Sequence, residues 1–191
     1  MTVPTIPTGT WVLDPGHTEV GFTVRHIMSK VRGSFTEFEG TIVTGETLAD
    51  SSAHVQVALS SIDTRNQQRD DHLRSSDFFD VATNPTMTFR STSVQDTGGG
   101  RLVLTGDLTI KGVTRPVDLD VEVLGVGRDP WGATRIGVEA SGQISRREFG
   151  VDFNIPLEGD KVMIGDKITL AITAQAVLQQ AAAEVPAGAR A

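Results

Sequence analysis

Apolar and polar residues alternate along most of this 191-residue chain, which is the pattern of strands with one buried face. In PVDLDVEVLGV (116–126), one side is apolar and the other acidic, because successive side chains of a strand point to opposite faces. The same alternation runs through HVQVALS, LVLTGDLTI, RIGVEASGQI and KITLAITAQA. EVGFTVRH, SFTEFEGTIV and TMTFRS are shorter or less regular. We therefore predict roughly eight or more strands.

The breaks between these strands have the composition of short turns. They are DPG (14–16), TGE (44–46), DTGGG (96–100) and RDPWG (128–132). Lys111-Gly112 is a candidate for a tight hairpin in which Gly112 has a positive φ, and Pro116 then falls at a strand start or edge. Short connections predict an antiparallel all-β fold, and alternation alone leaves barrel and sandwich equally open.

The stretch SSIDTRNQQRDDHLRSSDFFD (60–80) interrupts the strand pattern. Asp63 or Thr64 is suited to cap a short helix that ends at about Ser75. The neighbouring Asp70, Asp71 and His72 invite a metal site, but adjacent residues do not share a helix face, and no ligand follows His72 at helical spacing. We predict that these charges face water.

Composition excludes several classes of function. A net charge of −7 argues against nucleic-acid partners and disfavours attraction to anionic membranes. The absence of cysteine removes disulfides, thiolate metal sites and a cysteine nucleophile. MTVPTIPTGTWVLD shows no export leader and no window is long enough to span a bilayer, so we expect a cytoplasmic protein that is not membrane-embedded. We expect one domain over 1–191, with its core at about 9–178 and a frayed tail at 179–191.

Two polar groups are candidates for chemistry. DPGHTEVGFTVRH places Asp14, His17 and His26 around a turn and a strand, which suggests a metal or hydrolytic site. No HxH or HExxH spacing supports it, and a hydrogen-bonded histidine at a strand end is the favoured interpretation. In SRREFG, Arg147 is either a contact for a polar ligand head or part of a surface ion pair. We expect no catalytic residue, no metal and no cofactor.

Five stretches together resemble the YceI-like family of lipocalin-like, polyisoprenoid-binding proteins. They are WVLDPGHTEVGFTVRH, VRGSFTEFEG, SIDTRNQQRDDHLRSSDFFD, GDLTIKGVTRPVDL and SRREFG, and the resemblance spans roughly Trp11 to Val177. It implies an extended eight-stranded antiparallel β-barrel, usually dimeric, around a polyprenyl chain, an isoprenoid quinone or a fatty-acid-like lipid, with no established catalysis. Many relatives are periplasmic. Thr18 stands where serine is commoner, and Asn84 precedes Pro85 where an aromatic residue is usual.

These observations together predict an all-β lipocalin-like barrel, with segment 60–80 as a short helix and loop cap over one end. We expect it to bind, transport or store one long apolar molecule, and to form a homodimer. The alternatives are a metal-dependent or other enzyme that uses Asp14, His17 and His26, and a protein-interaction barrel without a ligand. His17, His26 and Arg147 are expected at the mouth of the cavity. The expected apolar contacts are Phe22, Val24, Ile27, Met28, Phe35, Phe38, Val57, Leu59, Leu73, Phe78, Phe79, Met87, Phe89, Leu104, Leu108, Leu119, Val138, Phe149, Ile168 and Leu170.

Overall fold

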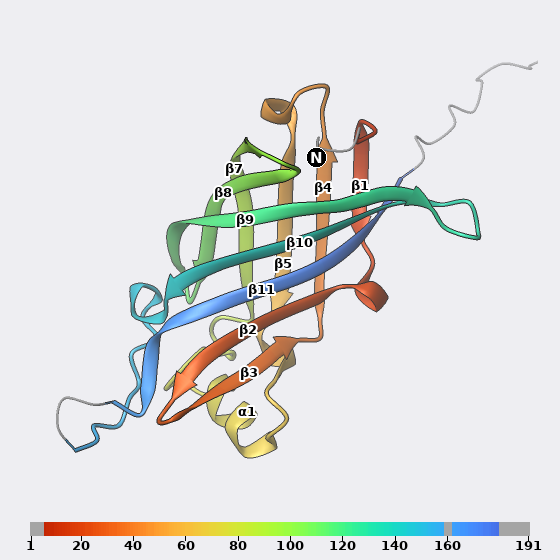
Figure 1. The fold of residues 1–191 in the computed structure, drawn as a ribbon. Coiled ribbons are helices and arrows are strands. Elements are labelled where there is room, and N and C mark those ends of the chain that lie inside the picture. Colours follow the sequence, from red (N-terminus) through yellow and green to blue (C-terminus); the bar gives the residue numbers. More distant parts are fainter. Residues whose placement is uncertain (1–5, 159–161, 180–191) are drawn as a thin grey trace, which may run out of the picture.

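The computed structural model describes residues 6–158 and 162–179, which form one antiparallel sheet of eleven strands and one short α-helix (Figure 1). The strands are β1 (Gly9–Leu13), β2 (Glu19–His26), β3 (Ser29–Phe35), β4 (Phe38–Thr44), β5 (Ser52–Ala58), β6 (Ile62–Asp63), β7 (Thr86–Gly98), β8 (Arg101–Ile110), β9 (Val113–Arg128), β10 (Thr134–Ser145) and β11 (Ile164–Leu178). The helix is α1 (Gln67–Arg74), and the 3-10 turns are η1 (Pro15–His17), η2 (Leu48–Asp50), η3 (Leu59–Ser61) and η4 (Arg146–Phe149). Apart from Gln179, the tail predicted to fray lies outside the described residues.

Eight of the strands close into a ring. Their order is β1-β4-β5-β7-β8-β9-β10-β11, and the ring closes because β1 pairs with β11 at Trp11↔Leu178 through Leu13↔Ala176. The predicted eight-stranded antiparallel barrel is therefore confirmed, and the sandwich is excluded. Closure leaves these strands without a free edge over the length that is paired.

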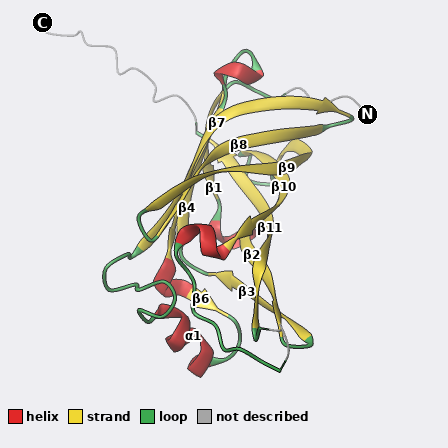
Figure 2. Ribbon diagram, turned by 90° about the vertical axis from the view of Figure 1, so that its left-hand side faces the viewer, coloured by secondary structure: helices red, strands yellow, loops and turns green. Residues whose placement is uncertain are grey.

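The other three strands branch from the ring at β11. This strand pairs with β1 at its carboxyl end and with β2 over Ile164–Thr173, so β2 and β3 extend the wall below the point of closure (Figure 1). The short strand β6 pairs with β3. Figure 2 places α1 at the same lower end, below β6. The barrel is therefore longer on this side than the closed ring alone.

The turn between β8 and β9 follows the sequence prediction. Lys111 and Gly112 both have positive φ, of 52° and 72°, which is the requirement of a type I′ hairpin turn. Pro116 pairs with Asp107 on β8, and the pairing of β9 with β10 begins only at Asp120. The missing N–H of Pro116 therefore faces an unpaired stretch of strand edge.

The helix begins later than predicted, and its cap is different. Asn66 is the N-cap, and its side-chain oxygen accepts a hydrogen bond from the backbone N–H of Arg69 at 3.0 Å. Thr64 instead holds Asp70, to which its backbone N–H and its hydroxyl both donate. Asp70 is only 4% exposed, so the prediction that every charge of α1 faces water is wrong for this residue.

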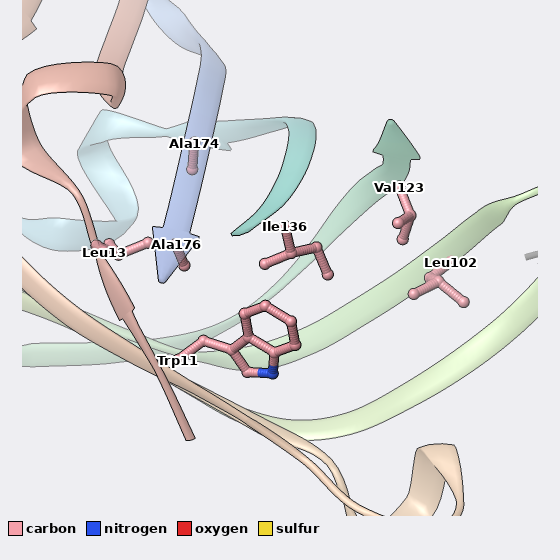
Figure 3. Packing of buried hydrophobic residues seen from close by; sticks show 7 residues of the cluster. All are labelled: Trp11, Leu13, Leu102, Val123, Ile136, Ala174 and Ala176. Carbon is pink, nitrogen blue, oxygen red and sulfur yellow. The ribbon is translucent and has the colours of Figure 1, made fainter. Parts of the chain in front are cut away.

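A cluster of buried apolar residues packs where the ring closes (Figure 3). Trp11 is fully buried there, and its indole N–H donates to the hydroxyl of Thr44 at 2.9 Å, which satisfies the polar atom of a large buried ring. The indole points towards Ile136 in Figure 3. The cluster comprises Trp11, Leu13, Leu102, Val123, Ile136, Ala174 and Ala176.

Two inward-facing glycines let phenyl rings lie against the wall. Gly33 pairs directly with Phe22, and a Cβ atom at Gly33 would lie 2.6 Å from that ring. A Cβ atom at Gly106 would lie 2.4 Å from the ring of Phe89 and 2.7 Å from the carbonyl oxygen of Arg90. Both rings therefore occupy space that any other residue at these positions would take.

We expect Gly106→Ala to lower the free energy of unfolding by about 1–3 kcal/mol, the usual cost of overpacking a tight site. The matched control is Gly127→Ala in β9, where a Cβ atom meets nothing within 4 Å and the backbone is not strained. Urea unfolding of the two variants and the parent chain measures both values. Equal stabilities would show that the Phe89 ring is not held against Gly106.

Candidate functional site

An apolar cavity of about 490 Å³ occupies the interior of the barrel. Every strand of the ring contributes side chains to it, and β2, β3 and β6 close its lower part. Because side chains alternate between the two faces of a strand, the lining takes every second residue, as in Val117, Leu119, Val121 and Val123 of β9. The volume lies within the range of small-molecule sites.

Several side chains that line the cavity at mid-barrel are only half-buried, although they point away from bulk solvent. They are Leu104, Val121, Val138, Ile144, Leu170 and Ile172. In a barrel filled by its own side chains such residues would be close-packed. Their remaining exposure is to the open interior, so this barrel is hollow.

The two ends of the cavity differ in polarity. Its exposed lining residues among those described are Glu46, Thr47 and Ser52, all in or beside the connection from β4 to β5. At the other end Phe78, Phe149 and Val151 are at most 5% exposed. These ends correspond to the top of Figure 1, where β4 meets β5, and to the bottom, where α1 lies. The cavity therefore opens at the β4–β5 connection and is closed at the α1 end.

The closed end is formed by the segment that follows α1, as the predicted cap requires. Phe78 packs with Val151 and Ile164 and makes ring contacts with His72 and Phe153 at centroid distances of 5.0 and 5.1 Å. Phe79 is less buried and packs edge-on against Phe35 at 6.2 Å. Both rings and Leu73 line the cavity.

Most of the predicted apolar contacts line this cavity. They are Phe22, Val24, Phe35, Val57, Leu73, Phe78, Phe79, Met87, Phe89, Leu104, Leu108, Leu119, Val138, Phe149, Ile168 and Leu170. Leu59 and Phe38 instead pack into the core beside the wall. Ile27 and Met28 form the exposed turn between β2 and β3, because the strand pattern ends at His26.

Several lining residues were missed although the same alternation indicates them. Val117, Val121 and Val123 share the face of Leu119, and Ala140 and Ile144 share that of Val138. No local pattern indicated Val151, which follows η4 rather than lying in a strand.

The polar residues expected at the mouth do not line the cavity. His17 is exposed in η1, His26 is at the far end of β2, and Arg147 is exposed in η4. The eight residues of β2 extend about 25 Å, so the two histidines lie at opposite ends of that strand. The group of three required by the enzymatic alternative is therefore not assembled. Among the described residues, no three His, Asp or Glu side chains gather as a metal site.

Asp14 and His17 belong to a structural network instead. The His17 Nδ1 atom lies 2.8 Å from Asp14, and Arg135 donates to Asp14 at 2.6 Å and to Asp129 at 2.8 Å. The hydrogen bond from Arg135, followed by that from His17, lowers the pKa of Asp14 to about 2. This network ties η1 to the turn between β9 and β10.

Arg146, rather than Arg147, is the arginine of SRREFG that reaches the cavity. It is 4% exposed and donates to four backbone carbonyls, at distances of 3.0 Å to Gly165, 2.6 Å to Val151, 3.0 Å to Phe153 and 3.5 Å to Ile164. Burial lowers the pKa of its guanidinium. Because backbone carbonyls accept most of its N–H groups, Arg146 stabilises the closed end and has few N–H groups left to donate to a ligand.

A model of the YceI-like domain matches residues 11–176 of the chain. Protein YceI of Escherichia coli O157:H7 is 42% identical over 137 residues, which cover 71% of this chain and 71% of that protein. The range 11–176 matched by the family model includes almost all of the closed ring.

Solved structures share the fold. The Campylobacter jejuni YCEI protein superposes with a TM-score of 0.69 at 31% identity, over 94% of this chain and 100% of that one. A polyisoprenoid binding domain from Saccharophagus degradans, implicated in plant cell wall breakdown, superposes with a TM-score of 0.66 over 91% of this chain and 100% of that one. At 16% identity this second likeness shows the fold alone.

We expect Arg146→Met to lower the free energy of unfolding by at least ~3 kcal/mol, because it leaves several buried carbonyls without a donor. The neighbouring Arg147→Met is the control, and at an exposed position its effect should stay within about 0.5 kcal/mol. Thermal and urea unfolding compare the two. A similar small effect in both variants would contradict the structural role of Arg146.

Proposed function

The chain belongs to the YceI-like family, and on that premise we propose that its barrel binds one long apolar molecule with a neutral polar end, such as a polyprenol or an isoprenoid quinone. The observation that carries this proposal is the hollow apolar interior, which runs from the β4–β5 connection to Phe78 and Phe79. A cavity with a polar rim and an apolar interior suits a molecule whose two ends differ in the same way.

Burial of hydrocarbon is the proposed source of affinity. Each methylene removed from water contributes on the order of 0.8 kcal/mol, so several isoprene units suffice for tight binding without a strong polar anchor. The half-buried lining residues, among them Leu104, Ile144 and Ile172, supply the surface that the chain would cover. Selectivity should accordingly depend on chain length and bulk.

The charge of the lining favours a neutral head group over a carboxylate or phosphate. The exposed rim carries Glu46 and has no cation among the described lining residues. Arg146 is the one cation of that lining, and it lies at the closed end with its donors engaged by carbonyls. An anionic head would meet the carboxylate of Glu46 at the open rim, and at the closed end it would lose hydration without gaining a free donor.

The proposed role is transport or storage of this molecule, in a protein that we propose forms a homodimer. Two features of the cavity suit a carrier: it opens at one end, and at the other end it is closed by a segment outside the ring. Among the described residues, no helix is long and apolar enough to cross a bilayer.

We expect Ala140→Phe to shorten the longest chain that the barrel accepts, because Ala140 lines the cavity at mid-barrel. Ala171→Phe is the matched control, since Ala171 lies on the adjacent strand, is exposed and is absent from the lining. Fluorescence titration with polyenes of graded length should show a loss of roughly 0.8 kcal/mol for each methylene excluded. Unchanged affinities in Ala140→Phe would refute cavity binding.

The same titrations test the head group. A prenol and the carboxylic acid of equal chain length are compared at neutral pH, and we expect the alcohol to bind more tightly. Tighter binding of the acid would contradict the proposed neutral ligand while leaving the apolar site intact.

Phe78 and Phe79 should play different parts at the closed end. Phe78 is 5% exposed, so Phe78→Ala should lower stability by about 3–5 kcal/mol. Phe79 is less buried and faces the cavity, so Phe79→Ala should mainly speed release of a bound polyene. Thermal melts of ligand-free protein and stopped-flow release give the two readouts. Equal effects of both variants on both readouts would contradict this division.

A further inference from the structure

An exposed apolar tip lies at one corner of the molecule, formed by the β2–β3 turn and the segment that leads into β11. We define the tip as Ile27, Met28, Ile155 and Val162, which are 46%, 93%, 46% and 43% exposed. The two segments are joined directly, because the backbone N–H of Ile27 donates to the carbonyl of Met163 at 2.7 Å. In Figure 1 they meet at the lower left, where β2 ends and β11 begins.

The turn at this tip is strained. Ile27 has a φ of 52°, a conformation that a β-branched residue rarely adopts. Asn-Gly or Asp-Gly is the usual pair in a two-residue hairpin turn, and here Ile27 and Met28 stand in that place. A strained backbone and exposed apolar side chains together indicate that this turn is a candidate interaction site, in addition to connecting two strands.

Unpaired cations lie directly behind the tip, on the outer face of the wall. Arg25 stands opposite Lys30 on the neighbouring strand, and Arg32 follows Lys30 on the same face. Lys167 of β11 is also exposed. It precedes Ile168, which pairs with Val24, and Val24 is the residue before Arg25. Within residues 6–158 and 162–179, none of the ion pairs involves these four cations. Facing like charges repel, so fold stability does not account for this arrangement.

The β2–β3 hairpin carries no carboxylate between Thr23 and Arg32, and the nearest carboxylates in the described chain belong to other segments. Asp166 is engaged by the hydroxyl of Ser145 and the backbone N–H of Arg147, and Asp152 and Glu158 lie in the segment leading to β11. The net charge of −7 includes groups at the far end of the barrel, and charges separated by more than about 8–10 Å are screened at physiological salt. The described end of this hairpin therefore carries three cations, Arg25, Lys30 and Arg32, with Lys167 beside them on β11.

We propose that this tip docks the protein on an anionic bilayer surface, with Met28 and Ile27 inserted among the acyl chains and the four cations on the lipid head groups. Apolar residues that insert a short distance, backed by basic residues, are the features that bind proteins to such surfaces. The docking surface goes beyond the proposed cavity function and does not depend on it. It lies close to the cavity, because Val24 and Ile164 line the interior beside the tip.

A second copy of the chain is the competing occupant, and the charges argue against it. A two-fold contact through the tip would set Arg25, Lys30 and Arg32 of one copy near the same residues of the other. Like charges brought together across an interface oppose association. An anionic membrane supplies the opposite charge over a wide area.

Vesicle co-sedimentation with the whole chain tests the proposal. Vesicles of phosphatidylcholine are compared with vesicles that contain phosphatidylglycerol as well, at low and physiological salt. We expect binding to the anionic vesicles only, weakened by salt. Met28→Glu should reduce binding at least tenfold, and Arg25→Gln, Lys30→Gln and Arg32→Gln should each reduce it about fivefold. Met28 is 93% exposed, so its replacement leaves the fold intact.

Matched controls lie elsewhere on the molecule. Trp131 is 86% exposed in the β9–β10 turn, so Trp131→Ser removes an equally exposed apolar side chain, and Arg115→Gln removes an exposed cation. Both should bind vesicles as the parent chain does. Loss of binding in these controls, or none by the parent chain, overturns the proposal. The proposal is also overturned if Met28→Glu binds vesicles as the parent chain does and only converts a dimer into a monomer, as measured by light scattering.

Polyene titration of Met28→Glu keeps the cavity proposal separate. We expect its affinity for the polyene to equal that of the parent chain.

Discussion

The pairing of β1 with β11 is the constraint on which the rest of the structure depends. It closes eight strands into a ring at Trp11↔Leu178, and a ring of that size is wide enough to be either filled by its own side chains or left hollow. Here the inward positions hold mostly aliphatic residues of moderate size, with Ala140 among them. Closure and small side chains together leave the cavity of about 490 Å³.

Each end of this cavity is shaped by elements that interrupt the ring. At one end the β4–β5 connection leaves Glu46 and Thr47 exposed at the rim. At the other, α1 and the residues after it bring Phe78 and Phe79 over the interior. Arg146 ties the backbone there by donating to the carbonyls of Val151, Phe153 and Gly165. The same end carries the tip and its cations on the outside, so the closed end of the barrel is the one that faces a partner surface in our proposals.

The alternation of apolar residues predicted the wall because a strand leaves each side chain only two directions. Val117 to Val123 and the Lys111-Gly112 turn are both as expected. Pairing between strands far apart in the sequence could not be predicted in the same way. The β2–β3–β6 branch, for example, depends on which edge of β11 is free. Arg146 and Arg147 have the same local pattern, and only the η4 turn decides which is buried. Asp70 is buried because Thr64, six residues away, supplies its hydrogen bonds.

Native mass spectrometry of the purified chain, before and after extraction with organic solvent, tests the central claim that the barrel is a container for a long apolar molecule. We predict one extractable molecule per barrel, with the mass of a polyprenol, a quinone or a similar neutral lipid, and a bare chain afterwards that rebinds a prenol of the same length. A chain that carries nothing before extraction and binds no prenol afterwards would contradict the account. A stoichiometric metal ion in place of the lipid would contradict it as well.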